Sequence, residues 1–419
     1  MEPETATDAL VVVGTDTVVA RGVRLPVAAV VVGGLTILQR ALRSAQLAGC
    51  PRIFVVTPDA DAVRRLAASD PVVTVPVHPI ERDGPTDSVA AVLHELRGRL
   101  PERVVAAPAD RVLTPASFQR AVAVAPSAPL ETLEAAVRRP SGLGPVILTP
   151  ADLREAGSAL LRSLRKPLAR HADGPTAFYL NRPVSLALSR WLVGTPVTPN
   201  HVTTVALLLG LAAAACAATA EWGLLIVGGL LLQLSSILDG VDGEIARMRL
   251  TASRAGEWYD TICDDVINTA FMIALGVAAV RRTGEPLWAW ATVAAAITAV
   301  VLASLLYREL ARHGIASHNH LRWGFEEGGR SAALARVARP VLVAFSYIAK
   351  RDTYTLVVLA LLVLDRPVAA FVFMAVGNAA VLVGFAVRRP SVAPDALREG
   401  IAPPAHPTQK AVPEGDGRM

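Results

Sequence analysis

The sequence predicts an α-helical membrane protein with six transmembrane helices, preceded by a soluble α/β domain. The 419-residue chain is 53% hydrophobic, more than an ordinary soluble chain, and the excess lies between about residues 200 and 390. Before about residue 150, short apolar segments alternate with amphipathic ones. We therefore expect a cytoplasmic α/β domain over 1–160, a basic connector over 161–200, a membrane domain over 201–390 and a disordered tail over 391–419.

The N-terminal part has the period of alternating strands and helices. Strands are expected at 9–14, 52–59 and 103–110, where apolar runs are short and bounded by turn residues. Helices are expected at 35–49, ending at Gly49, and at 87–100. Because strand and helix alternate, the predicted sheet is parallel and layered. The net charge of +5 is modest and no basic stripe interleaves with aromatic residues, so nucleic acid binding is not indicated.

The apolar region divides into segments long enough to cross a bilayer. The fifth segment is short for a hydrocarbon core about 30 Å thick, so it must extend into preceding residues or lie inside a bundle. Arginines concentrate in alternate connections, which predicts that both termini are cytoplasmic and that the protein lies in the cytoplasmic membrane. The connector can lie along the bilayer surface, with Trp191 on its apolar side and arginines such as Arg182 and Arg190 near headgroups. The six segments are 202–220, 222–240, 259–280, 286–307, 352–364 and 367–387.

Two pairs of aspartates stand at the ends of the second and third predicted spans. Asp239 and Asp242 are three residues apart and share a helix face, while Asp260 and Asp264 are four apart. Gly256 lies one turn below Asp260 on that face. Asp265 is rotated by about 100° from Asp264 and points elsewhere. An antiparallel helix pair joined by a short basic loop would bring the four carboxylates of the two pairs into one cavity.

Four converging carboxylates stay ionised only when cations neutralise them. Oxygen-rich sites suit Mg²⁺ or Mn²⁺, and two such ions side by side form a clamp for a pyrophosphate and for phosphoryl transfer. Gly243 and Ala246 lack bulk and would let a nucleotide approach, and Arg247 offers a planar fork to a phosphate. The alternative is a solvated helix-loop-helix in which the acids pair with neighbouring arginines.

The stretch "DGVDGEIARMRLTASRAGEWYDTICD", from Asp239 to Asp264, resembles the signature of the CDP-alcohol phosphotransferase family, and all of its fixed positions are filled. The resemblance implies a six-helix membrane enzyme, usually a homodimer, that uses a CDP-alcohol donor and releases CMP. It implies that Asp239, Asp242, Asp260 and Asp264 bind two divalent ions, with Asp264 as the general base. It also implies that the CDP part contacts Asp239, Gly243, Ala246, Arg247 and Gly256.

The acceptor alcohol is less well defined by the sequence. Members that use inositol phosphate often carry a basic residue two positions before the motif glycine, and Arg254 stands there. Arg308 and Arg351 could complete a phosphate pocket, or all three could be membrane anchors. The residues after Asp264 read "DVIN", where inositol-phosphate enzymes commonly have Asp-Arg, so the acceptor stays open between a small alcohol and an inositol phosphate.

The N-terminal part resembles the nucleotidyltransferase half of archaeal bifunctional inositol-phosphate cytidylyltransferase/di-inositol-phosphate-phosphate synthases. The resemblance rests on "VVVGGLTILQRALRSAQLAGCPRIFVVTPD" and on "AAPADRVLTP", which puts Asp110 in the metal position. Only Gly14 stands directly after the first strand, where a glycine-rich loop is needed, and no lysine follows Pro26 directly, so we expect a degenerate domain. Two alternatives remain: a bifunctional enzyme that also makes the CDP-alcohol from CTP, and a transporter or scaffold whose acids bind cations.

Overall fold

The structure is a computed structural model. It describes residues 7–13, 17–20, 23–82, 89–109, 112–120, 123, 125–129, 131, 155–156, 159–160, 176–318, 321–322, 351–387 and 390–392. Internal contacts divide the chain into two compact units. The first comprises residues 1–209, 232–252 and 350–356, and the second comprises 210–231, 253–349 and 357–419. Each unit is described by itself below.

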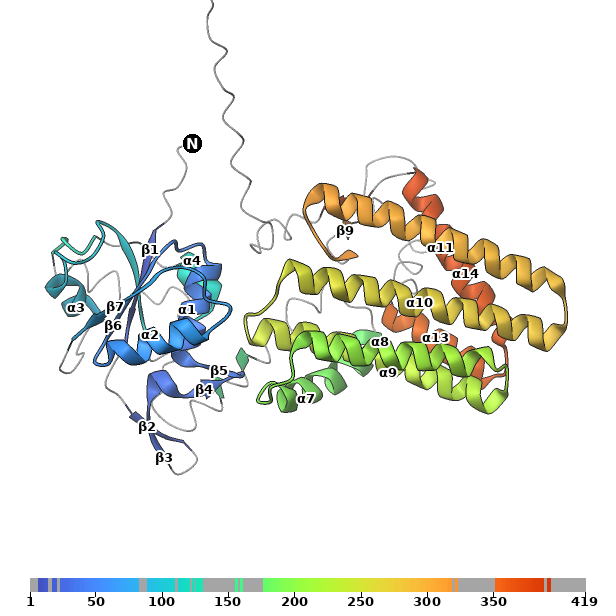
Figure 1. The fold of residues 1–419 in the computed structure, drawn as a ribbon, viewed down its shortest axis with the longest axis horizontal. Coiled ribbons are helices and arrows are strands. Elements are labelled where there is room, and N and C mark those ends of the chain that lie inside the picture. The colour runs from blue at the N-terminus through green and yellow to red at the C-terminus, as the bar shows by residue number, and fades with distance from the viewer. Residues whose placement is uncertain are drawn as a thin grey trace, which may run out of the picture. The chain divides into compact units, whose positions relative to one another are not determined.

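The N-terminal α/β domain, in the first unit, is built on a parallel sheet with the strand order β7-β6-β1-β8 (Figure 1). β1 (Asp8–Val12) pairs in parallel with both β6 (Ile53–Thr57) and β8 (Val104–Pro108), and β6 pairs in parallel with β7 (Val77–Glu81). The sequence-based prediction of a parallel sheet is therefore confirmed. Shorter elements complete the domain: β2 (Thr17–Ala20), β3 (Val23–Pro26), η1 (Val27–Ala29), β4 (Val31–Val32), β5 (Leu35–Thr36), α2 (Ala60–Ser69), α3 (Val89–Glu95) and α4 (Pro115–Arg120).

The central strand is buried on both faces. Ala9 and Val11 lie in the hydrophobic cluster that includes residues of α1 (Ile37–Leu47), while Leu10 and Val12 lie in the cluster that includes residues of α3. This split follows from the two-residue period of a strand, which sends successive side chains to opposite faces. A parallel sheet covered on both faces needs such a continuous apolar run, as "ALVV" supplies.

Helix α1 (Ile37–Leu47) lies within the predicted range of 35–49 and is two residues shorter at each end. Thr36 is its N-cap: its hydroxyl accepts from the Gln39 N–H at 3.1 Å, and the Gln39 side chain accepts from the Thr36 N–H at 3.0 Å. This reciprocal pair satisfies donors that a helix start otherwise leaves free. At the other end, Gly49 has φ +90°, a left-handed conformation that glycine adopts at little cost.

The C-terminal half consists mainly of long helices. Among the described residues, five helices are long and apolar enough to cross a membrane. The predicted fifth span corresponds to α13 (Arg351–Val363), whose 13 described residues fall short of that length. The remaining helices begin or end within about eight residues of their predicted limits. The five are α8 (Pro199–Ala218), α9 (Trp222–Met248), α10 (Arg254–Thr283), α11 (Pro286–His313) and α14 (Pro367–Val387).

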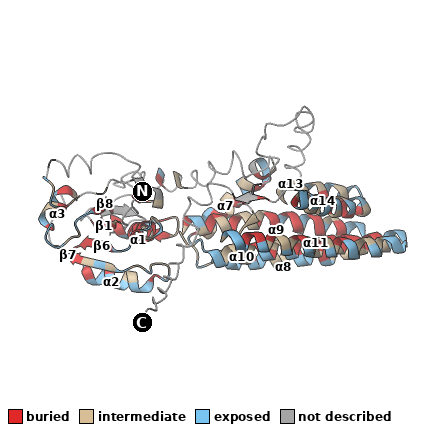
Figure 2. Ribbon diagram, turned by 90° about the horizontal axis from the view of Figure 1, so that it is seen from above, coloured by how far each residue is buried: buried red, intermediate tan, exposed pale blue. Residues whose placement is uncertain are grey.

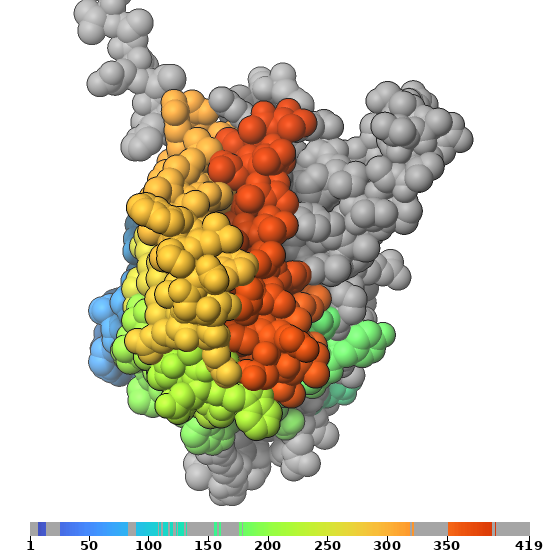
Figure 3. All heavy atoms as spheres, turned by 90° about the vertical axis from the view of Figure 1, so that its right-hand side faces the viewer, coloured from blue at the N-terminus to red at the C-terminus, as the bar shows by residue number. Residues whose placement is uncertain are grey.

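In the second unit, α10, α11 and α14 pack against one another (Figure 1), and α11 and α14 lie side by side in the space-filling view (Figure 3). Gly276 of α10 faces Thr292 of α11 so closely that an added Cβ would overlap the threonine side chain. Exposed apolar residues follow α11 along its length (Figure 2), among them Trp290 and Ile297. This pattern suits helices that face lipid on their outer side.

The predicted disordered tail lies mostly outside the described residues. Within them, β10 (Ser391–Val392) pairs in an antiparallel manner with β9 (Leu321–Arg322).

Candidate functional site

Asp239 and Asp242 lie on α9, which continues past the predicted limit of 240 to Met248. The extra turns carry Gly243, Ala246 and Arg247 on regular helix. Helix α10 begins after Ser253, whose hydroxyl accepts from the Gly256 N–H at 3.1 Å. This N-cap starts the helix early enough to place Asp260 and Asp264 within its first three turns.

The structure brings three of the four predicted aspartates together. Asp239, Asp260 and Asp264 each offer one carboxylate oxygen, and the three oxygens lie within 4.8 Å of one another. All three side chains are half-buried. Like charges this close raise one another's energy unless a cation neutralises them, so the donor set fits a hard divalent ion.

Asp242 is not one of this group of three. It is 5% exposed, and the hydroxyl of Thr203 donates a hydrogen bond to its Oδ2. Asp265 also has other partners: the Tyr307 hydroxyl donates to its Oδ2 at 2.7 Å, and His318 Nε2 lies 3.9 Å from the same oxygen. The sequence-based expectation that Asp265 points away from the site agrees with these partners.

His318 is half-buried and stacks on the Tyr307 ring at 6.1 Å between centroids. Burial lowers the pKa of His318, and the charge of Asp265 offsets this only in part.

Of the three predicted acceptor residues, Arg351 lies beside the aspartates. Its Nη1 is 3.0 Å from Asp239 Oδ1, and its side chain is 13% exposed. Arg254, the first residue of α10, and Arg308, near the end of α11, are exposed. The structure therefore distinguishes a half-buried arginine paired with Asp239 from two exposed arginines.

A buried polar network holds the start of α13 against α9. Asp352 accepts from Asn181 Nδ2 at 2.9 Å and from the Ser236 hydroxyl at 3.2 Å. Gln233 donates to Asn181 Oδ1 and accepts from the Thr355 hydroxyl, each at 2.8 Å. Because Ser236 lies one turn before Asp239, this network fixes the position of Arg351 next to it. The sequence contains a signal for this network, because the polar residues Gln233 and Ser236 stand at helical spacing inside an apolar run.

A second network was missed by sequence reasoning. Glu244 is fully buried on α9 and faces α7 (Arg182–Leu192), which follows the π-helical turn η2 (Ala177–Asn181). Arg182 Nη1 lies 2.9 Å from Glu244 Oε1, and the hydroxyls of Ser185 and Ser189 donate to the two carboxylate oxygens at 2.8 and 2.6 Å. Arg182, expected near headgroups, is thus paired inside the protein, while Trp191 is 74% exposed.

Of the other predicted nucleotide contacts, Gly256 lies in the first turn of α10, and Gly243, Ala246 and Arg247 lie on the last two turns of α9. The guanidinium of Arg247 lies over Gly243, with Nη1 3.2 Å from where a Cβ would stand. Arg247 is exposed and Ala246 is half-buried. A side chain larger than that of glycine at position 243 would displace the guanidinium. Gly243 and Arg247 therefore present an accessible backbone and a cation on the same face of α9.

The predicted nucleotide site of the α/β domain falls at the topological switch point of its sheet. The order β7-β6-β1-β8 has its switch point between β1 and β8, where ligands of open parallel sheets bind beyond the carboxyl ends of the strands. Gly14 and Asp110 follow these two strands, and both lie outside the described residues.

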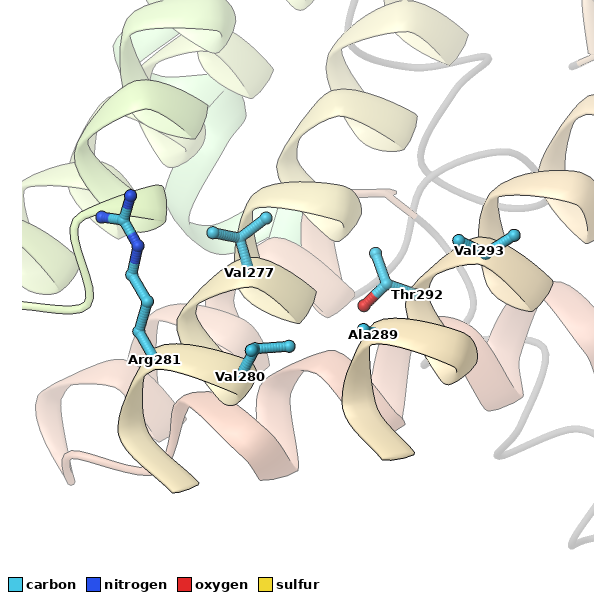
Figure 4. Close-up of a pocket in the computed structure, with 6 residues that line it drawn as sticks. All are labelled: Val277, Val280, Arg281, Ala289, Thr292 and Val293. Carbon is cyan, nitrogen blue, oxygen red and sulfur yellow. The ribbon is translucent and has the colours of Figure 1, made fainter. Parts of the chain in front are cut away.

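An apolar hollow on the second unit has no comparable chemistry (Figure 4). It is lined by residues of α10 and α11, and Arg281 is its one charged lining residue among those described. Its first lining residue, Val277, is roughly 20 Å along α10 from Asp264, at 1.5 Å per residue. The hollow is separate from the carboxylate group. Its lining residues are Val277, Val280, Arg281, Ala289, Thr292 and Val293.

Comparison with known proteins defines the class of both parts. Residues 196–386 match the family model described as CDP-alcohol phosphatidyltransferase, and residues 24–174 match the MobA-like NTP transferase domain. The helical part of the chain is therefore similar to CDP-alcohol phosphatidyltransferase domains, and the α/β part is similar to MobA-like NTP transferase domains.

The chain is similar to several proteins named bifunctional IPC transferase and DIPP synthase. The protein from Thermococcus kodakarensis is 36% identical over 154 residues, which is 37% of this chain and 33% of that protein. Those from Aquifex aeolicus and Archaeoglobus fulgidus are each 36% identical over 129 residues, 31% of this chain and 28% and 25% of theirs. The matched part thus spans a third or less of each relative.

Proposed function

We propose that the protein is an integral membrane CDP-alcohol phosphotransferase. It transfers a substituted phosphoryl group from a CDP-alcohol, such as CDP-diacylglycerol or CDP-inositol, to an acceptor alcohol, in phospholipid or polar-headgroup synthesis. The observation that carries the proposal is the group formed by Asp239, Asp260 and Asp264 within a region that matches the family. A transporter or scaffold has no need of Gly243 and Arg247 beside these acids.

The site residues take the following roles in this proposal. Asp239, Asp242, Asp260 and Asp264 hold two Mg²⁺ or Mn²⁺ ions, and Thr203 orients Asp242. When bound, such ions neutralise the pyrophosphate and the charge that develops during transfer. The CDP part lies against Asp239, Gly256 and the last turns of α9, where Gly243 and Ala246 leave room and Arg247 binds a phosphate.

Asp264 acts on the acceptor. Its carboxylate accepts the proton of the acceptor hydroxyl as the oxygen attacks the phosphorus that bears the donor alcohol. The bond from that phosphorus to the CMP oxygen breaks and CMP leaves. Arg351 and the exposed Arg254 and Arg308 are available to an acceptor that carries a phosphate, such as inositol phosphate; a neutral small alcohol would need none of them.

In the cell we place the protein in the cytoplasmic membrane as a homodimer, with six spans and both termini cytoplasmic. The five candidate spans and the excess of arginine in the connections on one side support this arrangement. The sixth span is then α13 with the residues before it, which supply the missing length.

Release of CMP tests the function. Membranes with the protein are incubated with CDP-diacylglycerol or CDP-inositol and a panel of alcohols and inositol phosphates, with Mg²⁺ or Mn²⁺. Asp264→Asn should cut turnover by orders of magnitude while donor binding persists; Asp265→Asn, its neighbour with other partners, is the matched control. Wild-type turnover in Asp264→Asn would refute the assignment of Asp264 as the general base. If no donor yields CMP, the phosphotransferase proposal fails and the transporter or scaffold remains as the alternative.

A second activity is favoured by the joined domains. The MobA-like match and the relatives named bifunctional both support an α/β domain that makes the CDP-alcohol from CTP. The sequence between β1 and Pro26 holds only Gly14 and Gly22, and no lysine follows Pro26 directly; both features support a degenerate domain instead. Release of pyrophosphate from CTP and inositol phosphate, lost in Asp110→Asn, would establish the second activity. If the full chain releases no pyrophosphate, the α/β domain does not make the CDP-alcohol.

A further inference from the structure

The C-terminal end of α9 is closed by an unusual set of donors. The last carbonyls of a helix have no partners within it. Here Leu250 adopts φ +52°, a left-handed conformation that turns the chain and lets the following N–H groups fold back. At this turn the Ala246 carbonyl accepts from the Thr251 N–H at 2.9 Å and the Arg247 carbonyl from the Leu250 N–H at 3.3 Å, while the Ile245 carbonyl accepts from the Arg249 N–H at 2.9 Å in the ordinary helical pattern.

The next two carbonyls accept from side chains of the α/β domain. Arg40 Nη2 lies 2.6 Å from the Met248 oxygen, and Arg43 Nη1 lies 2.6 Å from the Arg249 oxygen. Both arginines belong to α1, more than 200 residues away in sequence. Cations at the C-terminus of a helix also interact favourably with its dipole.

The two arginines are fixed within their own domain. Arg40 is 1% exposed and also donates to the Val32 oxygen at 3.0 Å. Arg43 binds both carboxylate oxygens of Asp70, at 2.8 and 3.0 Å. Burial, together with the charge of Arg43, lowers the pKa of Arg40 to about 10, so the side chain remains charged at neutral pH.

The turn before α1 also approaches this end of the helical region. Gly34 has φ +79°, and a Cβ there would overlap the carbonyl oxygen of Val193. Glycine is required both by the conformation and by the contact. Arg249 donates to the same carbonyl at 3.0 Å and to that of Val197 at 2.6 Å, so it ties the turn after α7 to the end of α9.

We propose that Arg40 and Arg43 make the α/β domain the C-terminal cap of α9 and thereby act as positioning residues for the CDP-alcohol donor. The inference rests on the proposed function, because Arg247 and Gly243, which we assign to the donor, lie on the turns that this cap closes. It gives the α/β domain a role in the phosphotransferase whether or not the domain turns over CTP.

The test uses the full-length protein and the variant Arg43→Lys. Lysine keeps the charge beside Asp70 but lacks the second arm of the fork that reaches the Arg249 carbonyl. Arg52→Lys is the matched control, since Arg52 binds Asp8 in the same two-pronged way (2.7 and 3.1 Å) elsewhere in the domain. Two quantities are measured: amide hydrogen exchange at Leu250 and Thr251, and the donor KM and kcat for CMP release.

In Arg43→Lys we expect exchange at Leu250 and Thr251 to be about ten-fold faster, as for loss of one charged hydrogen bond. The donor KM should rise several-fold with a smaller change in kcat, and Arg52→Lys should match the wild type in both. Exchange equal to that of Arg52→Lys would overturn the cap. Faster exchange with an unchanged donor KM would overturn the positioning role.

A third variant distinguishes a general loss of stability of the α/β domain from loss of the cap. Asp70→Asn weakens the ion pair inside the domain but leaves Arg43 able to donate to the Arg249 carbonyl. If exchange at Leu250 and Thr251 rises as much in Asp70→Asn as in Arg43→Lys, the effect reflects domain stability and the proposal fails. Absence of CMP release by the wild type would reject the proposed function, while the exchange rates would still decide whether the cap exists.

Discussion

Replacing Glu244 by glutamine should weaken the attachment of α7 to α9. The carboxylate is fully buried and holds Arg182, Ser185 and Ser189 through three contacts of 2.6–2.9 Å. Glutamine has nearly the same shape and retains one oxygen, so it creates no cavity. What is lost is the negative charge opposite Arg182, whose side chain is only 14% exposed.

The magnitude follows from that geometry. A hydrogen bond to a charged group contributes about 1.5–3 kcal/mol, and breaking a buried ion pair from one side costs about 3–5 kcal/mol. Because glutamine still accepts one hydrogen bond and Arg182 keeps some contact with solvent, we expect a loss of about 2–3 kcal/mol. For a unit of this size that lowers the unfolding midpoint by about 5–10 °C.

The assay is thermal unfolding of the purified protein in detergent, followed with a thiol-reactive dye that reports exposure of the buried Cys50 and Cys263. Asp61→Asn is the matched control, because it removes the same charge from an ion pair with Arg64 whose side chains are 72% and 60% exposed. Such exposed pairs contribute little. Equal midpoints for Glu244→Gln and Asp61→Asn would refute the argument that burial makes the Glu244 pair strong.

Four further outcomes are expected. Tyr307→Phe removes the hydroxyl that donates to Asp265 and should cost about 1.5–3 kcal/mol of stability; an unchanged melting midpoint would contradict that hydrogen bond. Burial lowers the pKa of His318, so as the pH falls this histidine is protonated in the unfolded chain before it is protonated in the folded protein. The stabilisation that neutral His318 gives the folded protein is therefore fully present above about pH 6.5 and is lost as the pH falls below that value. In His318→Phe the melting midpoint should therefore depend less on pH between about pH 5 and 7 than in the wild type. An equally strong pH dependence in the variant would contradict this. Burial, then the charge of Asp8, raises the pKa of Cys50 to about 11, so a maleimide at pH 8 should leave it unlabelled in the folded protein, and labelling at the rate of a free thiol would exclude the buried site. Arg254→Ala should raise the acceptor KM for CMP release if the acceptor carries phosphate; an unchanged KM removes Arg254 from the acceptor site.

Within single elements, the sequence was sufficient. The apolar run that begins "ALVV" predicted a strand, and Gly49 marked the end of α1. The spacing of the aspartates predicted which of them share a helix face, and the structure brings three of the four together. These features depend on residues a few positions apart, where the period of a helix or strand decides which side chains are neighbours.

Pairings between distant segments needed the tertiary structure. Arg182 was expected near headgroups and instead pairs with Glu244, while Arg249 donates to the carbonyls of Val193 and Val197. Arg40 reaches the end of a helix more than 200 residues away. A long cationic side chain has the same local sequence pattern at a surface, in an ion pair or at a helix end. Its role is decided only when packing removes it from water beside a particular carboxylate or carbonyl.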